Sequence, residues 1–250
     1  MTSDPRRETV LPHQLHGYHK SYLIDQAGSG VIALKDTEKL PICLIKCCQA
    51  QKRSSMKLQF ASHKNLVSLI DHFHSDDEVQ LIYEYEHLAI SLGCVAGTVS
   101  FSEADIATIC KEVLDGLKYV HTVLRITYGL LDFSNILITW QGEVKLANIG
   151  ESLLLGHPLR VVSKDLKGVG SIVVLLSDRI APLREANPDL PPLSSLATEF
   201  VQRTDRETSV EHLIEDEFLH LANPGGTWSL KRHYFDTLPL GIRIGNRVGT

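Results

Sequence analysis

The segment from Tyr128 to Gly150 constrains the fold of this chain more than any other part of the sequence. Its letters, YGLLDFSNILITWQGEVKLANIG, contain two short apolar runs on either side of Gln141-Gly142, a dipeptide typical of a turn. A loop precedes the first run, and a glycine follows the second. The pattern therefore predicts a loop, a hairpin of two short strands and a glycine exit. Such a shape is suited to holding catalytic side chains and a metal ion.

Strand patterns dominate the chain before this segment. The runs Ser21–Ile24 and Val31–Leu34 flank a turn at Asp25–Gly30, which predicts a β-hairpin. Further strands are expected at residues 40–48, 66–73 and 79–85, with at most one short helix around residues 53–61. The first part of the chain is therefore predicted to be rich in strands.

Helical patterns dominate after Glu86. Ser102 followed by Asp105 predicts a helix N-cap with an acidic residue at its third position. Apolar residues then recur at helical spacing as far as His121. Further helices are expected at residues 166–176, 196–202 and 210–221. A strand-rich lobe followed by a helical lobe predicts an α+β architecture with a cleft between the lobes.

Four segments are expected along the chain. They are a polar lead-in at residues 1–20, an N-terminal lobe at 21–86, a C-terminal lobe at 87–222 and a mixed tail at 223–250. Hydrophobic residues make up 43% of the chain and charged residues 22%, which is ordinary for a globular protein. The sequence therefore offers ample apolar material for a core.

Charge and cysteine content limit the partners and the compartment. The formal net charge of −5 does not suggest a nucleic-acid partner. The longest apolar run, Ile172–Leu176, is far shorter than the ~20 residues that cross a bilayer, so no membrane partner is expected. The five cysteines show no paired spacing, and we expect reduced thiols in the cytoplasm or nucleus. Cys47 and Cys48 are interpreted as structural, and the Asp71–His74 segment as a solvated turn.

Several segments, in the right order, resemble motifs of the eukaryotic protein kinases. The matches are Ile24–Ile32 with the glycine-rich loop, Cys43–Lys46 with V-A-I-K, Leu131–Leu137 with the end of H-R-D-L-x-x-x-N-I-L, and Val144–Gly150 with V-K-L-x-D-F-G. Asp165–Gly170 is similar to the start of the helix that supports the catalytic loop. The resemblance extends from about Tyr22 to Leu221. It implies a bilobal protein-kinase-like fold with a shortened helical lobe.

The resemblance also implies that the catalytic positions are degenerate. Leu130 stands where the family has its catalytic aspartate, and leucine cannot accept a proton. Asn148 replaces the metal-binding aspartate, and an amide offers Mg²⁺ no negative charge. Ser55 falls near the position of the glutamate that pairs with the family's lysine. We therefore expect no metal site, and magnesium binding is not predicted.

Some cofactor-binding positions remain by the same resemblance. Lys46 would grip nucleotide phosphates, Gly28 and Gly30 would belong to the glycine-rich loop, and Asn135 matches a metal-holding asparagine. Each has a structural alternative: a solvated head group for Lys46, a hairpin turn for the glycines, and a loop cap for Asn135. The expected cofactor is accordingly none, or weakly bound ATP.

The apolar part of the nucleotide pocket is changed as well. Leu44 and Leu137 take cofactor-facing positions, and Tyr83 stands at the back of the pocket. Leu44 and Tyr83 add bulk where a purine ring would slide in, and overfilling a packed site commonly costs ~1–3 kcal/mol. We therefore expect the pocket to be partly filled by the protein itself.

The segment that forms the substrate-binding surface in the kinases is short in this chain. Only 16 residues, 149–164, separate Asn148 from Asp165, and no A-P-E motif is visible. The arginine that would pair with that motif aligns near Glu207. Loss of both partners is self-consistent, because a single buried charge would be costly.

The resemblance favours a catalytically inactive kinase-like domain, a pseudokinase, that binds or regulates an unidentified protein partner. Three alternatives remain open. Lys46 could support residual nucleotide binding without metal, Asp132 could replace the missing base in a weakly active kinase, or the chain could have no selected function. His121, after the long helix, is interpreted as structural.

Overall fold

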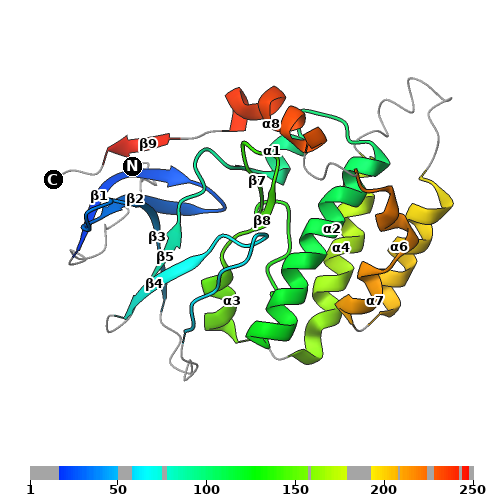
Figure 1. Cartoon of the computed structure of the whole chain (residues 1–250), viewed down its shortest axis with the longest axis horizontal. Helices are drawn as coiled ribbons and strands as arrows, with labels where there is room; N and C mark the ends of the chain where they lie inside the picture. The colour runs from blue at the N-terminus through cyan, green and yellow to red at the C-terminus, as the bar shows by residue number, and fades with distance from the viewer. Residues whose placement is uncertain are drawn as a thin grey trace, which may run out of the picture.

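The computed structural model describes residues 17–49, 58–74, 78–156, 159–178, 193–207, 209–223, 228–241 and 244–247. In these ranges a mostly antiparallel sheet forms one lobe and a group of helices forms the other (Figure 1). The predicted α+β class is therefore confirmed. The sheet has the strand order β4-β5-β3-β2-β1-β9, so that its last strand comes from the end of the chain.

Five strands of the N-terminal lobe follow the predicted segments. They are β1 (Tyr18–Asp25), β2 (Ser29–Lys35), β3 (Ile42–Gln49), β4 (Leu69–His74) and β5 (Glu78–Glu84). The turn between β1 and β2 places Ala27 at a φ of 51° and Gly28 at a φ of 98°, the left-handed region that favours glycine. A second, smaller hydrophobic cluster lies on the sheet. It is formed by alternate residues of the strands, among them Ala33, Cys43, Ile45 and Ile82.

The helix expected around residues 53–61 is not found where the structure can be described. Residues 53–57 lie outside the described residues, and Ala61 instead forms an isolated bridge with Leu69. The short run from Leu58 to Phe60 has no regular structure.

A second, three-stranded sheet connects the lobes. It consists of β6 (Ile90–Ser91), β7 (Ile136–Ile138) and β8 (Val144–Leu146), in the order β6-β7-β8. β7 and β8 form the predicted hairpin, and Gly142 in its turn has a φ of 87°. The helix α1 (Leu92–Ala96) follows β6 directly.

The helical lobe is built around two long helices, α2 (Glu103–Tyr119) and α4 (Val162–Asp178). α2 begins with the predicted capping box: Ser102 Oγ accepts from Asp105 N at 3.2 Å, and Asp105 Oδ2 accepts from Ser102 N at 3.0 Å. A π-helical turn (Val120–Leu124) ends it. The remaining helical elements are α3 (Ile149–Leu155), a 3₁₀ turn (Leu159–Val161), α6 (Ser195–Arg206), α7 (Val210–Ile214) and a 3₁₀ turn (Glu217–Leu221).

The C-terminal segment is more ordered than the mixed tail that the sequence predicted. It forms the helix α8 (Trp228–Gly241) and the strand β9 (Ile244–Arg247), which pairs with β1. α8 packs against α1, so the segment contacts both lobes (Figure 1). The fully buried Tyr234 donates its hydroxyl hydrogen to Leu88 O at 2.9 Å. This helix is hard to recognise in the sequence because Pro239 lies within it, although Leu230, Tyr234 and Leu238 recur at helical spacing.

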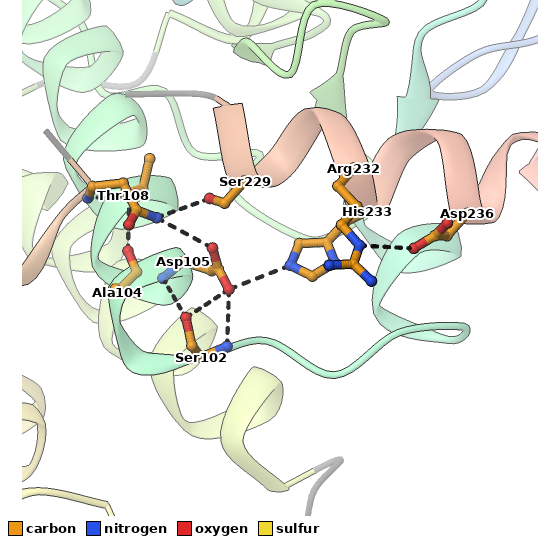
Figure 2. Close-up of polar contacts among 9 residues, drawn as sticks. Ser102, Ala104, Asp105, Thr108, Ser229, Arg232, His233 and Asp236 are labelled. Carbon is orange, nitrogen blue, oxygen red and sulfur yellow. Dashed lines mark hydrogen bonds and ion pairs between the residues drawn. The ribbon is translucent and has the colours of Figure 1, made fainter. Parts of the chain in front are cut away.

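A polar cluster attaches α8 to the start of α2. Figure 2 shows Asp105 between Ser102 and His233, whose Nε2 lies 3.3 Å from Asp105 Oδ2. Asn223 donates to Ser229 Oγ at 2.8 Å and to Asp105 Oδ1 at 3.3 Å. Burial acts to raise the pKa of Asp105, but the hydrogen bonds from His233 and Ser102 outweigh it and hold that pKa well below its usual range. The capping carboxylate of α2 is thus also the anchor of α8.

No helix in the described ranges is long and apolar enough to cross a membrane.

Candidate functional site

Lys46 lies in the centre of the region where the two lobes meet. Its side chain is 4% exposed, and its ammonium donates to Gln26 O at 2.9 Å, Ala27 O at 2.6 Å and Asn148 Oδ1 at 2.7 Å. A lysine ammonium has three donors, so all of them are used. The interpretation of Lys46 as a strand lysine with a solvated head group is therefore wrong. The β1–β2 turn covers the ammonium and supplies two of its acceptors.

Burial sets the proton affinity of this ammonium. Desolvation lowers the pKa of Lys46 to about 8, and the carboxylates of Glu151 and Asp25 act against it by favouring the charged form. Glu151 was not among the predicted site residues. It approaches Lys46 because α3 begins directly after Asn148 and its first turn carries Glu151. A glutamate three residues after Asn148 was the only sequence signal available.

Asn148 and Asn135 are brought together, as the motif resemblance implies. Asn148 has a φ of 57°, and its Nδ2 donates to Asn135 Oδ1 and to Ala27 O, each at 2.9 Å. Asn135 Nδ2 in turn donates to Leu130 O at 2.8 Å. The two amides are thus bonded to each other and to the backbone, and Asn135 holds the loop as its structural alternative predicted. In the described part of the chain, no group of three or more His, Cys, Asp or Glu side chains is arranged to hold a metal ion.

The roof of the pocket is closed by Gln26. This side chain is 4% exposed, and its Nε2 donates to Glu86 O at 2.9 Å and Ala89 O at 3.0 Å in the connection between the lobes. It was not among the predicted site residues, because a glutamine in a turn carries no pattern that distinguishes it from a solvated side chain. Here it reaches inward and occupies space between the lobes.

Little room is left between these side chains. The remaining cavity has a volume of about 10 Å³ and is lined by Leu44, Lys46, Tyr83, Leu137, Asn148 and a few neighbours. Ligand pockets typically measure ~300–1,000 Å³, and about 10–15 Å³ is the space that one water needs. The expected self-filling of the pocket is confirmed. Leu44, Tyr83 and Leu137 line what remains of this cavity.

The two glycines predicted at the hairpin both face β3. A Cβ on Gly30 would lie 2.6 Å from Leu44 Cδ1, so a larger residue there would displace Leu44. A Cβ on Gly28 would lie 3.9 Å from Lys46 Nζ. Gly28 lies in the turn that joins β1 and β2, as the hairpin interpretation predicted, whereas Gly30 lies within β2 and is paired with Ile24.

Tyr83 and Gly150 contact each other at the back of the pocket. The Tyr83 oxygen accepts a hydrogen bond from Gly150 N at 3.0 Å, and a Cβ on Gly150 would lie 2.7 Å from that oxygen. Gly150 therefore allows α3 to approach β5 closely. Nearby, burial and Glu151 raise the pKa of the Cys48 thiol to about 12, consistent with its structural interpretation.

The loop before β7 keeps its shape without a carboxylate at position 130. Leu130 is half-buried and packs against the main core. Asp132 is turned toward its own loop: its Oδ1 accepts from Ser134 N at 2.7 Å and from Asn135 N at 3.2 Å, and it also contacts the Ser134 hydroxyl. The Asp132 carboxylate thus serves as a cap for the loop.

Asp165 in α4 supports this loop through its carboxylate. Its carboxylate is almost fully buried and accepts from Tyr128 N at 2.8 Å and Gly129 N at 2.7 Å, with His121 Nε2 also 2.8 Å away. The expected support of the loop by this helix is confirmed, although the helix begins at Val162 rather than at Asp165. His121 acts as a partner of Asp165, in line with its structural interpretation.

Two further positions considered in the sequence, Glu207 and Asp71, lie outside the site around Lys46. Ser55 lies outside the described residues. Glu207 pairs locally, with Arg203 at 4.0 Å and His212 at 3.1 Å. Asp71 sits in β4, where its carboxylate lies 3.7 Å from Lys35 Nζ and accepts from the Tyr18 hydroxyl. The Asp71–His74 segment therefore belongs to the strand expected at residues 66–73 and is not a solvated turn.

Comparison with known proteins agrees with the motif order. A family model described as the protein kinase domain matches residues 22–165, more than half of the chain. The serine/threonine-protein kinase shk1/pak1 of Schizosaccharomyces pombe is 39% identical over 88 residues, or 35% of this chain and 13% of that protein. The dual specificity mitogen-activated protein kinase kinase 1 of Dictyostelium discoideum is 30% identical over 124 residues, or 50% of this chain and 18% of that protein. This chain thus spans only a small part of the length of these relatives.

Proposed function

Because this chain belongs to the protein kinase family, we propose that it uses the kinase fold to bind a protein partner and does not transfer phosphoryl groups. The observation that carries the proposal is the closed network around Lys46. The three donors of that ammonium are bonded to the protein itself, and a cavity of about 10 Å³ remains where a nucleotide would have to enter. Nothing of a purine's size fits that space.

The chemistry of phosphoryl transfer supports the same proposal. That reaction depends on positioning of the nucleotide and on neutralisation of charge by metal ions and donors. Leu130 has no group to orient an attacking hydroxyl, and Asn148 and Asn135 offer only neutral oxygens to a metal. The one carboxylate of the loop, Asp132, is bonded to its own backbone.

A second candidate is a nucleotide-responsive switch. Lys46 and Asn135 are retained, and the acceptors over Lys46 belong to a turn that could swing away with Gln26. Opening would break the hydrogen bonds from Lys46 and Gln26 to the turn and the connection, and each such bond contributes about 0.5–1.5 kcal/mol. ATP could favour the open form only by the difference in its affinity for the two forms.

Calorimetric titration with ATP, with and without Mg²⁺, tests the proposal. We expect no binding heat at millimolar ATP for the wild type or for Lys46→Met, and no phosphate transfer to a generic peptide. Binding that is lost in Lys46→Met would favour the nucleotide switch. Turnover that requires magnesium and is abolished by Asp132→Ala would overturn the proposal and identify an atypical kinase.

A further inference from the structure

A groove lies on the outer side of the connection between the lobes, away from the filled pocket. Its volume is about 700 Å³, and its walls come from the start of β3, the loop before β4 and the end of β5. It shares no lining residue with the 10 Å³ cavity around Lys46. The volume falls within the range of ~300–1,000 Å³ that is typical of ligand-binding sites. A site of ligand-binding size therefore lies outside the pocket around Lys46.

The walls of the groove carry exposed apolar side chains. Phe60 is 67% exposed and Ile42 is 47% exposed, and both line it. Leu34 pairs with Ile42 across β2 and β3, and Leu40 precedes it in the same hairpin, extending the apolar surface with exposures of 36% and 49%. Single exposed apolar residues are normal, but a continuous set beside a groove is typical of an interaction site.

The polar groups of the groove define the charge of its occupant. Glu84 lines it with an exposed carboxylate, for which no ion pair is found in the part of the chain that the structure describes. None of the lining residues is a lysine or an arginine. Burial raises the pKa of the adjacent Cys43 thiol; Lys35 opposes the rise, and Asp71 and Glu84 add to it. The groove is thus apolar with one free negative charge.

We propose that this groove binds a peptide segment of a partner protein that presents an apolar side chain next to a lysine or arginine. The apolar side chain packs between Phe60 and Ile42, and the cation pairs with Glu84. An exposed pair of this kind adds little affinity by itself but selects the sign of the partner's charge. This inference rests on the proposed recognition function and names the surface that performs it.

Selection of a phage-displayed random peptide library on the full chain tests the inference. We expect the selected peptides to share an apolar residue within a few positions of a lysine or arginine. Resynthesised peptides should bind Phe60→Ser roughly tenfold more weakly than the wild type, as for a central anchor. Glu84→Lys should select peptides with aspartate or glutamate in place of the basic residue. Leu175→Ser and Glu199→Lys, exposed positions in α4 and α6, serve as matched controls and should change nothing.

Three results would overturn the inference. Selected peptides that bind Phe60→Ser as tightly as the wild type would place recognition elsewhere while leaving a recognition function intact. A consensus unchanged by Glu84→Lys would mean that the groove takes apolar ligands without regard to charge. A dimer in sedimentation that Phe60→Ser dissociates would assign the groove to a second copy of the chain. None of these results bears on ATP binding, so they are distinct from failure of the non-catalytic proposal.

Discussion

Two buried polar centres lie near the loop before β7, and their buried groups carry opposite charges. In one, the carboxylate of Asp165 accepts from Tyr128 N and Gly129 N, with the ring of His121 beside it. In the other, the ammonium of Lys46 donates to three oxygens. The Asp165 centre holds the loop in shape, whereas the Lys46 centre closes the space between the β1–β2 turn and Asn148. The two centres share no residue, so the comparison teaches that support of the loop and closure over Lys46 are separate.

The two centres differ in how well their charge is compensated. Asp165 has a histidine ring in direct contact and backbone N–H groups that serve a carboxylate well. Lys46 is bonded to neutral oxygens, with Glu151 acting only at longer range, and burial lowers its pKa. A buried charge with neutral partners keeps part of its desolvation cost. The Asp165 centre should therefore add to the free energy of unfolding, whereas the Lys46 centre should contribute little to it at neutral pH.

The largest effect is expected from Asp165→Ala, which tests the supporting centre. The change leaves two backbone N–H groups and the His121 ring without their acceptor in a buried site. Removal of one partner from a buried charged network costs about 3–5 kcal/mol. Urea denaturation should show this loss in the free energy of unfolding.

A matched control separates support from the mere loss of a carboxylate. Asp205 in α6 pairs with Lys167 at 3.7 Å, and both side chains are largely exposed. Asp205→Ala should therefore cost no more than about 0.5 kcal/mol. If Asp165→Ala costs as little as this control, the two centres do not differ in the way described.

Lys46→Met is expected to have an intermediate effect on the free energy of unfolding. The effect is recognised by its dependence on pH. The pKa of Lys46 is about 8 in the folded chain and near its ordinary value of 10.5 when unfolded. Between these values the unfolded chain binds one more proton than the folded chain, so the free energy of unfolding rises with pH. The rise is about 1.4 kcal/mol per pH unit, or about 2 kcal/mol over one and a half units above pH 8.

The readout is the difference between wild type and Lys46→Met, measured by urea denaturation at each pH. The thiols and phenols with raised pKa values are present in both proteins, so their contribution cancels. The wild type should gain stability relative to the variant as the pH rises from about 8. Parallel curves for the two proteins would mean that the ammonium is not buried as described, and the contrast with Asp165 would fail.

Sequence patterns predicted these two centres to different degrees. The loop and the β7–β8 hairpin followed from local turn and strand patterns, whereas the support from Asp165 followed from the resemblance to the kinase motif order. Gln26 and Glu151 could not be found in this way, because their roles depend on how a turn and a helix start fold over Lys46. The same holds for α8 and β9, whose order comes from contacts with both lobes rather than from their own periodicity. Burial of Lys46 itself depended on these unpredicted neighbours.

The smallest effect is expected from Leu130→Asp, which returns a carboxylate to the loop without altering either centre. Leu130 is half-buried at the edge of the core, so the loss of stability should be modest, about 1–2 kcal/mol. Phosphate transfer from labelled ATP to a generic peptide should stay at background. Asn148 offers no charge to a metal, and the cavity of about 10 Å³ is too small for a nucleotide. The double variant Leu130→Asp, Asn148→Asp should also stay inactive, since Gln26 still fills the cleft. Activity in the single variant would show that the loss is local to position 130, and the Lys46 centre would then be an openable lid rather than a permanent filling.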